Sequence, residues 1–356
     1  MSDLVLAVNP GAGSTKLALY RGGVSVGDHT ERHAEAELAR FTRVAEQLAW
    51  RLEGVRAFLA RSGVARGALA GVVGRGGLFK PIESGTYAVD DAMLKDAGEA
   101  ARGEHASNLG APLARAIAEE HGCPAFIVDP VSIDELAPVA RLSGLAGVPR
   151  QSLCHALNMR AVARRHAAAE RRPLAELRLV IAHLGTGASL CALSGARMVD
   201  VVNPQDEGPF SGDRCGGLPA TALIDLCFAP GADRRALRRR LFGDGGLFSY
   251  LGTRDVREAA RRAAAGDAEA ALVLDAMAYQ LAKAVGELSV VLEGRVDAVL
   301  LTGGAAHEPA LVEAVRRRVA WIAPVKLYPG EDELLALVEG ARRVLRGEEQ
   351  AKRYGA

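Results

Sequence analysis

Residues 5–19 read Val-Leu-Ala-Val-Asn-Pro-Gly-Ala-Gly-Ser-Thr-Lys-Leu-Ala-Leu, an apolar run followed by a turn of small residues and a second alternating run. This order predicts a β-hairpin whose tip carries Asn9, Ser14, Thr15 and Lys16. The second run is too strand-like for a strand–P-loop–helix unit, and the G-x-x-x-x-G-K-[ST] order of that unit is missing. Small residues let backbone N–H groups approach an anion closely. The hairpin therefore indicates phosphate binding, and phosphoryl transfer is the leading functional hypothesis.

Composition sets the broad class of the protein. The chain has 356 residues, of which 49% are hydrophobic, so two domains with substantial cores are expected. The formal net charge of +1 indicates neither a nucleic-acid groove nor a surface for acidic membranes. The five cysteines include no C-x-x-C pair, which is typical of a reduced cytoplasmic compartment rather than of a disulfide framework or a zinc site. No apolar run reaches the length of a membrane-spanning helix, so a cytoplasmic protein without nucleic-acid or membrane partners is expected.

Helical and strand patterns alternate along the chain, which indicates a mainly α/β fold. In the first half we expect helix, strand, helix and strand at residues 38–62, 71–74, 105–120 and 124–128. The pattern restarts with a helix and then a second hairpin, at residues 155–170, 177–184 and 190–193. The turn of this second hairpin, Gly185-Thr-Gly-Ala-Ser189, is again made of small residues. We infer a weak internal duplication with a phosphate-facing hairpin in each half.

The last part of the chain continues the same alternation. It predicts helix, strand, helix and final helix at residues 268–293, 298–301, 308–319 and 333–346. The final helix is expected to pack back on the first domain. A run of arginines at residues 234–240 is interpreted as the solvated face of a short helix.

Several short segments, in this order, resemble the acetate/butyrate kinase family of the sugar kinase/Hsp70/actin superfamily. They are the N-terminal hairpin, Gly74-Arg-Gly-Gly77, Asp129-Pro130, His155-Ala-Leu-Asn158, Ala182-His-Leu-Gly-Thr-Gly187 and Leu301-Thr-Gly-Gly304. Four further segments resemble the butyrate kinase branch: Lys80-Pro-Ile82, His105-Ala-Ser-Asn-Leu-Gly110, Glu207-Gly-Pro-Phe-Ser211 and Leu345-Arg-Gly-Glu-Glu349. The matches cover nearly the whole chain, and their common order makes the resemblance specific.

The resemblance implies a fold and an activity. The expected fold is two duplicated actin-like (ribonuclease H-like) α/β domains flanking a nucleotide cleft. Residues 1–150 would form the acyl- and phosphate-side domain, residues 151–332 the nucleotide-binding domain, and the helix within 333–356 would pack on the first. The expected activity is reversible phosphoryl transfer between ATP and butanoate, which gives butanoyl phosphate and ADP. Acetate, propionate or branched-chain acids are alternative acceptors, and a non-catalytic nucleotide-binding regulator of the same fold is the alternative from another class.

The resemblance also implies a magnesium site at Asn9 and Glu333. Mg²⁺ takes oxygen ligands and is often held by one or two protein oxygens together with phosphates. Asn9 ends a strand at the phosphate turn, and Glu333 lies in an acidic segment, where Glu331 or Asp332 could take the role instead. The alternative is that these acids only favour the positive end of a helix dipole.

Two arginines are candidates for holding anions. Arg75 follows a strand in a glycine-rich loop, where its guanidinium could fork onto a carboxylate, and the resemblance assigns it to the carboxylate of the acyl substrate. The alternative is an ordinary surface arginine in a turn. Arg214 matches the family arginine that stabilises the transferring phosphoryl group. The preceding Gly212 and Asp213 depart from the usual Ser-Pro-Glu-Arg of butyrate kinases, which puts the rigidity of this loop in question.

Three further residues are candidate catalytic or phosphate-binding groups by resemblance. The resemblance makes Asp129 the acid/base or the acceptor-orienting carboxylate, and we favour an orienting or arginine-holding role because the acceptor is already a carboxylate; the alternative is an Asp–Pro turn, which is common anywhere. His155 would stabilise the transition state, and His183 would begin the phosphate-binding segment. A lone histidine at the end of a strand is more often a satisfied core residue.

The nucleotide-binding residues complete the expected site. They are Lys16, His183, Gly185, Gly187, Asp255, Arg257, Gly303 and Gly304. Thr186 stands where butyrate kinases usually have Gly and acetate kinases Asn. The partners implied are a small carboxylic acid, ATP/ADP and a second copy of the chain, as a homodimer or larger homo-oligomer.

Overall fold

The computed structural model describes residues 3–355, and the chain divides into two compact units. Unit 1 is the chain up to Asp134 together with the segment from Asp332 onward, and unit 2 is Glu135–Glu331. The sequence analysis placed the boundary at residue 150. The structure assigns the segment after Asp134 to unit 2 because the Glu135 carboxylate accepts a hydrogen bond from Met198 N. Within residues 3–355, no helix is both long and apolar enough to cross a membrane.

Unit 1 is built on a seven-stranded sheet with the order β12-β5-β6-β4-β1-β2-β3. Its strands are β1 (Leu4–Pro10), β2 (Ser14–Arg21), β3 (Val24–Arg32), β4 (Gly71–Arg75), β5 (Thr86–Ala88), β6 (Ala125–Val128) and β12 (Lys352–Arg353). Its helices are α1 (Glu35–Leu38), α2 (Leu48–Arg61), α3 (Asp91–Glu99), α4 (Gly110–His121) and α12 (Glu333–Leu345), with 3₁₀ turns at Val44–Gln47 and Ala106–Leu109. Strands β1, β2 and β3 form an antiparallel meander, and β1, β4 and β6 run parallel.

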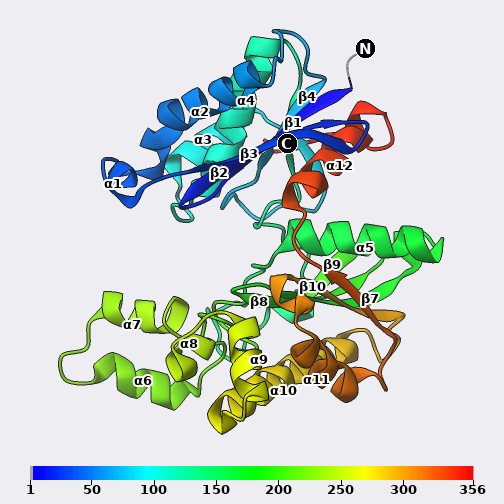
Figure 1. Ribbon diagram of the computed structural model, residues 1–356. Coiled ribbons are helices and arrows are strands. Elements are labelled where there is room, and N and C mark those ends of the chain that lie inside the picture. Colours follow the sequence, from blue (N-terminus) through cyan, green and yellow to red (C-terminus); the bar gives the residue numbers. More distant parts are fainter. Residues whose placement is uncertain (1–2, 356) are drawn as a thin grey trace. The chain divides into compact units, whose positions relative to one another are not determined.

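Both faces of the unit 1 sheet are covered, which is why every residue of β1 is buried. Alternate residues of a strand point to opposite faces. On one face Leu4, Leu6 and Val8 join the core formed with α2 and α4. The C-terminal helix α12 packs on β1, β4 and β6 (Figure 1). A Cβ atom added at Gly340 of α12 would lie 2.5 Å from Val128 Cγ1 of β6, so this glycine permits the close approach of helix and sheet.

The long helix expected at residues 38–62 begins ten residues later than predicted. The structure has the short α1, an irregular segment and then α2 from Leu48. In between, the carboxylate of Glu46 accepts hydrogen bonds from Thr42 N and Arg43 N, and Arg43 Nη2 donates to Gly98 O. These bonds hold the segment in a turn although its apolar spacing is helical.

Unit 2 contains a five-stranded sheet with the order β11-β10-β7-β8-β9 (Figure 1). Its strands are β7 (Arg178–Leu184), β8 (Ala188–Ser194), β9 (Arg197–Val202), β10 (Ala298–Gly303) and β11 (Val325–Pro329). Its helices are α5 (Ala156–Glu170), α6 (Ala220–Phe228), α7 (Arg234–Phe242), α8 (Gly246–Leu251), α9 (Val256–Ala264), α10 (Ala268–Val291) and α11 (Pro309–Val319), with 3₁₀ turns at Pro138–Arg141, Leu174–Glu176 and Gly304–His307.

The topology confirms the predicted duplication. In unit 2, β7, β8 and β9 form an antiparallel meander, as β1, β2 and β3 do in unit 1. Strands β7, β10 and β11 run parallel, as β1, β4 and β6 do in unit 1. Helices α10 and α11 form the main core with alternate residues of β7 and β8, and α5 packs against β7 and β10 (Figure 1). The arginine run falls on α7, which has no buried residue, as the sequence predicts.

Candidate active site

The first phosphate-type turn is the tip of the β1–β2 hairpin in unit 1. Asn9 and Lys16 are directly opposed in register across the two strands, so their side chains lie on the same face. Asn9 is buried, whereas Lys16 is exposed. Gly11 N donates to Ser14 O at 2.7 Å and closes the turn. The predicted hairpin therefore exists and presents an amide and an ammonium group side by side.

Glu333, at the start of α12, joins two residues from the sheet. Asn9 Nδ2 donates to Glu333 Oε2 at 2.7 Å, and Arg75 Nη1 donates to the same oxygen at 2.8 Å. Arg75 ends β4 next to β1, and its side chain is 30% exposed. The structure thus brings together three residues that are far apart in the chain: Asn9 and Glu333, which the sequence analysis named as a pair, and Arg75, which it named for another role. Arg75 holds a carboxylate in this arrangement, which is the type of group expected to bind there.

Asp129 lies just after β6, next to the strand that carries Arg75. Its backbone has a positive φ of 39°, which is uncommon for a residue other than glycine. Its Oδ1 accepts from Gly85 N at 2.8 Å, and its own N–H donates to Gly85 O. The carboxyl group is buried and ties the chain after β6 to the loop before β5.

The second turn, between β7 and β8, carries the two candidate histidines of unit 2. The rings of His155 and His183 stack with their centroids 3.9 Å apart and their planes 13° from parallel. His155 Nδ1 lies 2.8 Å from Ser189 Oγ. His183 Nε2 lies 3.0 Å from Glu331 Oε1, but the alignment is not that of a hydrogen bond.

Two residues that the sequence analysis did not assign, Asn158 and Thr302, orient the His183 ring. Gly330 O can only accept, so Asn158 directs its Nδ2 to that oxygen and its Oδ1 to His183 Nδ1, at 3.1 Å. Thr302 Oγ1 donates to the same Oδ1 at 3.0 Å. His183 Nδ1 therefore donates to Asn158 Oδ1, and Nε2 is directed toward Glu331. Asn158 lies in the His155-Ala-Leu-Asn158 segment that carries the resemblance, and nothing else in the sequence indicates its contact with His183.

Arg214 lies against the turn of the second hairpin. A Cβ atom added at Gly187 would lie 2.8 Å from the Arg214 Cζ, and one added at Gly185 would lie 2.9 Å from His183 Nε2. Glycine is needed at both positions because these side chains occupy the space. Burial raises the pKa of the neighbouring Asp213 carboxyl group, and the charges of Arg214 and Arg254 counter part of that effect.

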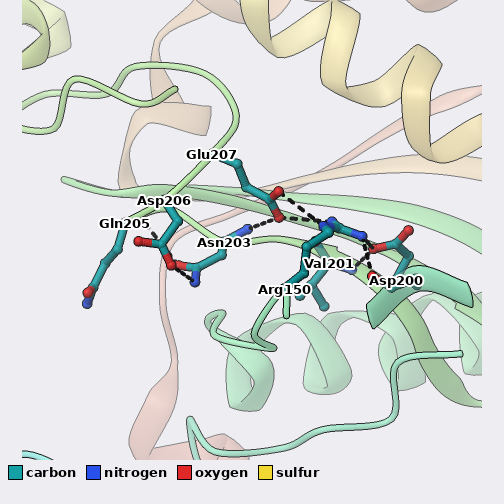
Figure 2. A network of polar contacts seen from close by, with 8 residues as sticks. Arg150, Asp200, Val201, Asn203, Gln205, Asp206 and Glu207 are labelled. Atoms are coloured by element: carbon teal, nitrogen blue, oxygen red, sulfur yellow. Dashed lines mark hydrogen bonds and ion pairs between the residues drawn. The ribbon is translucent and has the colours of Figure 1, made fainter. Parts of the chain in front are cut away.

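A polar network holds the start of the segment that leads to Arg214 (Figure 2). Arg150 donates to both oxygens of Glu207, to Asp200 Oδ1 and to the carbonyl of Val201. The hydrogen bonds to Glu207 raise the pKa of Arg150. Figure 2 shows Arg150 between the two acids, and Glu207 also accepts from Asn203 N. Glu207 begins one of the segments that resemble the butyrate kinase branch. Its contacts with Arg150 and Asn203 give this residue a structural role in holding the segment in place.

The residues expected on the nucleoside side lie in unit 2 as well. Thr302 is paired with His183 across β10 and β7, so Gly303 and Gly304 follow at the same edge of the sheet. Gly303 has a φ of 90°, and a Cβ atom there would lie 2.5 Å from Leu184 O. Asp255 caps α9 and pairs with Arg257 Nη2 at 2.9 Å, and both side chains are largely exposed.

Asn9 and Glu333 are suited to a magnesium ion by their chemistry. Each side chain has an oxygen atom that can act as a metal ligand, and the Asn9 amide is buried against the Glu333 carboxylate. Over residues 3–355, no group of three or more His, Cys, Asp and Glu side chains forms a metal cage. One carboxylate and one amide oxygen match the usual protein contribution to an Mg²⁺ site that is completed by phosphates and water.

The chain shares its fold with solved structures of small-molecule kinases. It matches an acetate kinase of Porphyromonas gingivalis with a TM-score of 0.79, over 96% of this chain and 99% of that one, at 17% identity. A propionate kinase of Francisella tularensis matches with a TM-score of 0.76, over 96% of this chain and 100% of that one, also at 17% identity. At this level of identity the likeness shows the shared actin-like fold.

The sequence comparisons define the family. The model of the Acetokinase family matches residues 146–328. A "Probable butyrate kinase 2" of Caldanaerobacter subterraneus subsp. tengcongensis is 44% identical over 99% of both chains. A "Probable butyrate kinase" of Enterococcus faecalis is 47% identical over 99% of this chain and 98% of that one. The chain belongs to the acetokinase family and is a kinase.

Proposed function

We propose that this protein is a butyrate kinase, which transfers the γ-phosphoryl group of ATP to butanoate and, in reverse, that of butanoyl phosphate to ADP. The observation that carries the proposal is the contact between Arg75 and a carboxylate beside the phosphate-type hairpin of unit 1. The choice of butanoate is supported by the names of the two relatives that are 44% and 47% identical to the chain.

In this proposal unit 1 binds the acceptor. The Arg75 guanidinium would exchange the Glu333 carboxylate for that of the acid, since a charge-assisted hydrogen bond to either has the same chemistry. Asp129 would keep the loop after β6 in place rather than remove a proton, because an ionised acid needs no general base. Lys16, exposed beside Asn9, would contact a phosphate.

Unit 2 would supply the groups for the transferring phosphoryl group and the nucleotide. His155, His183 and Arg214 gather at the turn containing Gly185 and Gly187. Phosphoryl transfer depends mainly on positioning and on stabilising charge at the equatorial oxygens, and this cluster can donate hydrogen bonds and positive charge to them. The backbone after Gly303 and Gly304 would receive the nucleoside, with the Asp255–Arg257 pair at its side.

Asn9 and Glu333 would hold the Mg²⁺ that accompanies ATP. The ion, when bound, supplies positive charge that neutralises the phosphate oxygens. Glu333 would then leave Arg75, which makes the guanidinium available to the acid. Glu331 is the weaker candidate for this role because it lies beside His183.

Acid preference is the direct test of the proposed substrate. With ATP, Mg²⁺ and a series of acids from acetate to hexanoate, we expect kcat/KM for ADP release to be highest for butanoate. A longer apolar chain gains roughly 0.8 kcal/mol per buried CH₂ until the pocket is filled, so the profile should rise from acetate and then fall. A maximum at acetate or propionate would assign the enzyme to another branch of the family. No acid-dependent release with any member of the series would reject the proposal.

We also propose that the protein is a homodimer or a larger homo-oligomer in solution. Unit 2 exposes large apolar side chains on its helices, among them Ile224, Phe228 and Val290. Large apolar side chains left exposed on helices can be covered when chains associate. Multi-angle light scattering at micromolar concentration should give at least twice the mass of 37.3 kDa. A mass of one chain that persists at high concentration would contradict this.

A further inference from the structure

A buried arginine on α2, Arg51, supports the back of the phosphate-type turn. Its side chain is only 1% exposed. Arg51 Nη1 donates to Ser14 O at 3.2 Å and to Thr15 Oγ1 at 2.9 Å, both in the turn. Nε and Nη2 donate to Gln47 Oε1 at 3.0 and 2.9 Å. The guanidinium therefore joins Gln47, the residue just before α2, to the tip of the β1–β2 hairpin, and every acceptor it contacts is uncharged.

The positive charge of Arg51 is not neutralised by an ion pair. Among residues 3–355, no carboxylate lies within 4.0 Å of its guanidinium. Burial lowers the pKa of Arg51 to about 10, and the more distant charge of Glu31 offsets a smaller part of that effect. The group is still protonated at neutral pH. The hydrogen bonds of Arg51 and its position 5.9 Å over the Trp50 ring satisfy the group without cancelling its charge, so an anion bound near the turn would be favoured.

The hydrogen bonds beyond Arg51 fix the direction of the network. Because Arg51 donates to Thr15 Oγ1, the Thr15 hydroxyl can give its proton to His33 Nε2, which lies 2.8 Å away. Burial, and to a lesser extent the charge of Arg51, lower the pKa of His33, while Glu37 raises it. A neutral His33 that accepts at Nε2 satisfies the chain of bonds. His33 N also donates to Gly13 O, so the same residues hold the turn from two sides.

We propose that Arg51 is a positioning residue for phosphate binding: it holds the turn at Ser14 and Thr15, and its buried charge is compensated when a nucleotide polyphosphate reaches the hairpin tip. This inference rests on the proposed function, in which that hairpin meets phosphate. A charge in a protein interior acts over several ångströms with less screening than in water, so Arg51 can favour an anion that it does not touch. Its effect should be specific to the β- and γ-phosphates, because the nucleoside is assigned to unit 2.

Binding of ATP and of AMP, measured separately by calorimetry with Mg²⁺ and no acid, tests the inference. Arg51→Met keeps the length of the side chain and removes its charge. We expect it to weaken ATP binding by about tenfold to a hundredfold and to leave AMP binding within threefold. Arg51→Lys, which keeps a charge but loses the fork, should lie between the two. Arg56→Met on the same helix is the matched control, because Arg56 pairs with Glu120 at the surface.

Thermal unfolding separates positioning from simple support of the fold. Arg51→Met removes a buried charge but leaves Ser14 O, Thr15 Oγ1 and Gln47 Oε1 without their donor, so a modest fall in melting temperature is expected, and AMP binding reports whether the fold is intact. Unchanged ATP binding in Arg51→Met, or an equal loss of ATP and AMP binding in both Arg51 variants, would overturn the inference. If Arg51→Met does not fold, the same comparison in Arg51→Lys decides. Failure of the unaltered protein to bind ATP would instead reject the proposed function.

Discussion

Replacing Arg214 by alanine is expected to lower kcat by ~10³–10⁵-fold while the KM values for ATP and for the acid change only a few-fold. The guanidinium lies against the glycine turn of unit 2, beside Gly187. In that position we propose that it contacts the oxygens of the transferring group, where charge spreads in the transition state more than in the ground state. Steady-state kinetics in both directions measures the effect.

The controls for Arg214 separate chemistry from folding. Arg214→Lys should restore little activity, since a point charge lacks the planar fork of guanidinium, whereas added guanidinium should restore part of the rate of the alanine variant. Arg239→Ala is the matched control, because Arg239 pairs with Asp244 on the exposed surface of the same unit. All variants should melt near the temperature of the unaltered protein. A near-normal kcat in Arg214→Ala would show that this arginine only supports the loop.

Replacing Arg75 by alanine should raise the KM for the acid and lower kcat, with a combined loss in kcat/KM of ~10- to 150-fold. This corresponds to ~1.5–3 kcal/mol for a hydrogen bond to a charged group. The affinity for ATP should change much less, because the Glu333 carboxylate released from Arg75 stays beside Asn9. Kinetics with either substrate varied at saturation of the other gives both quantities.

A conservative variant sharpens the test of Arg75. Arg75→Lys keeps a positive charge at the end of β4 but cannot make two parallel hydrogen bonds to a carboxylate, so it should recover only part of the acid affinity. If ATP affinity collapses in Arg75→Ala while the KM for the acid is unchanged, the assignment of this loop to the acceptor is wrong.

The parts of the fold that depend on local pattern could be predicted from the sequence. Both hairpins and α5, α10 and α11 lie close to their predicted positions, because apolar periodicity and small-residue turns are local signals. The segment before Leu48 has the same apolar periodicity, yet Glu46 and Arg43 bind it in a turn, and such contacts leave no periodic signal. Short strands such as β5 and β12 are formed by pairing with a distant neighbour and have little pattern of their own.

The candidate site was predictable where residues lie in recognisable turns. Asn9 and Glu333 were named as a pair through the resemblance, and the structure brings them to 2.7 Å. Arg51 and Thr302 were not found, because the first looks like one more arginine on a helix and the second like an ordinary strand residue. Their importance lies in which atoms they reach across the fold, and that information is absent from their local sequence.

Trapping the product with hydroxylamine tests the central claim most directly, because acyl phosphates react with it to give hydroxamates. Enzyme, ATP, Mg²⁺, butanoate and hydroxylamine are mixed, and the ADP and butanohydroxamate formed are measured together. The account predicts equal amounts of the two, no ADP above background without an acid, and loss of both products in Arg214→Ala. Release of ADP without hydroxamate, or at the same rate without butanoate, would contradict phosphoryl transfer to a carboxylate.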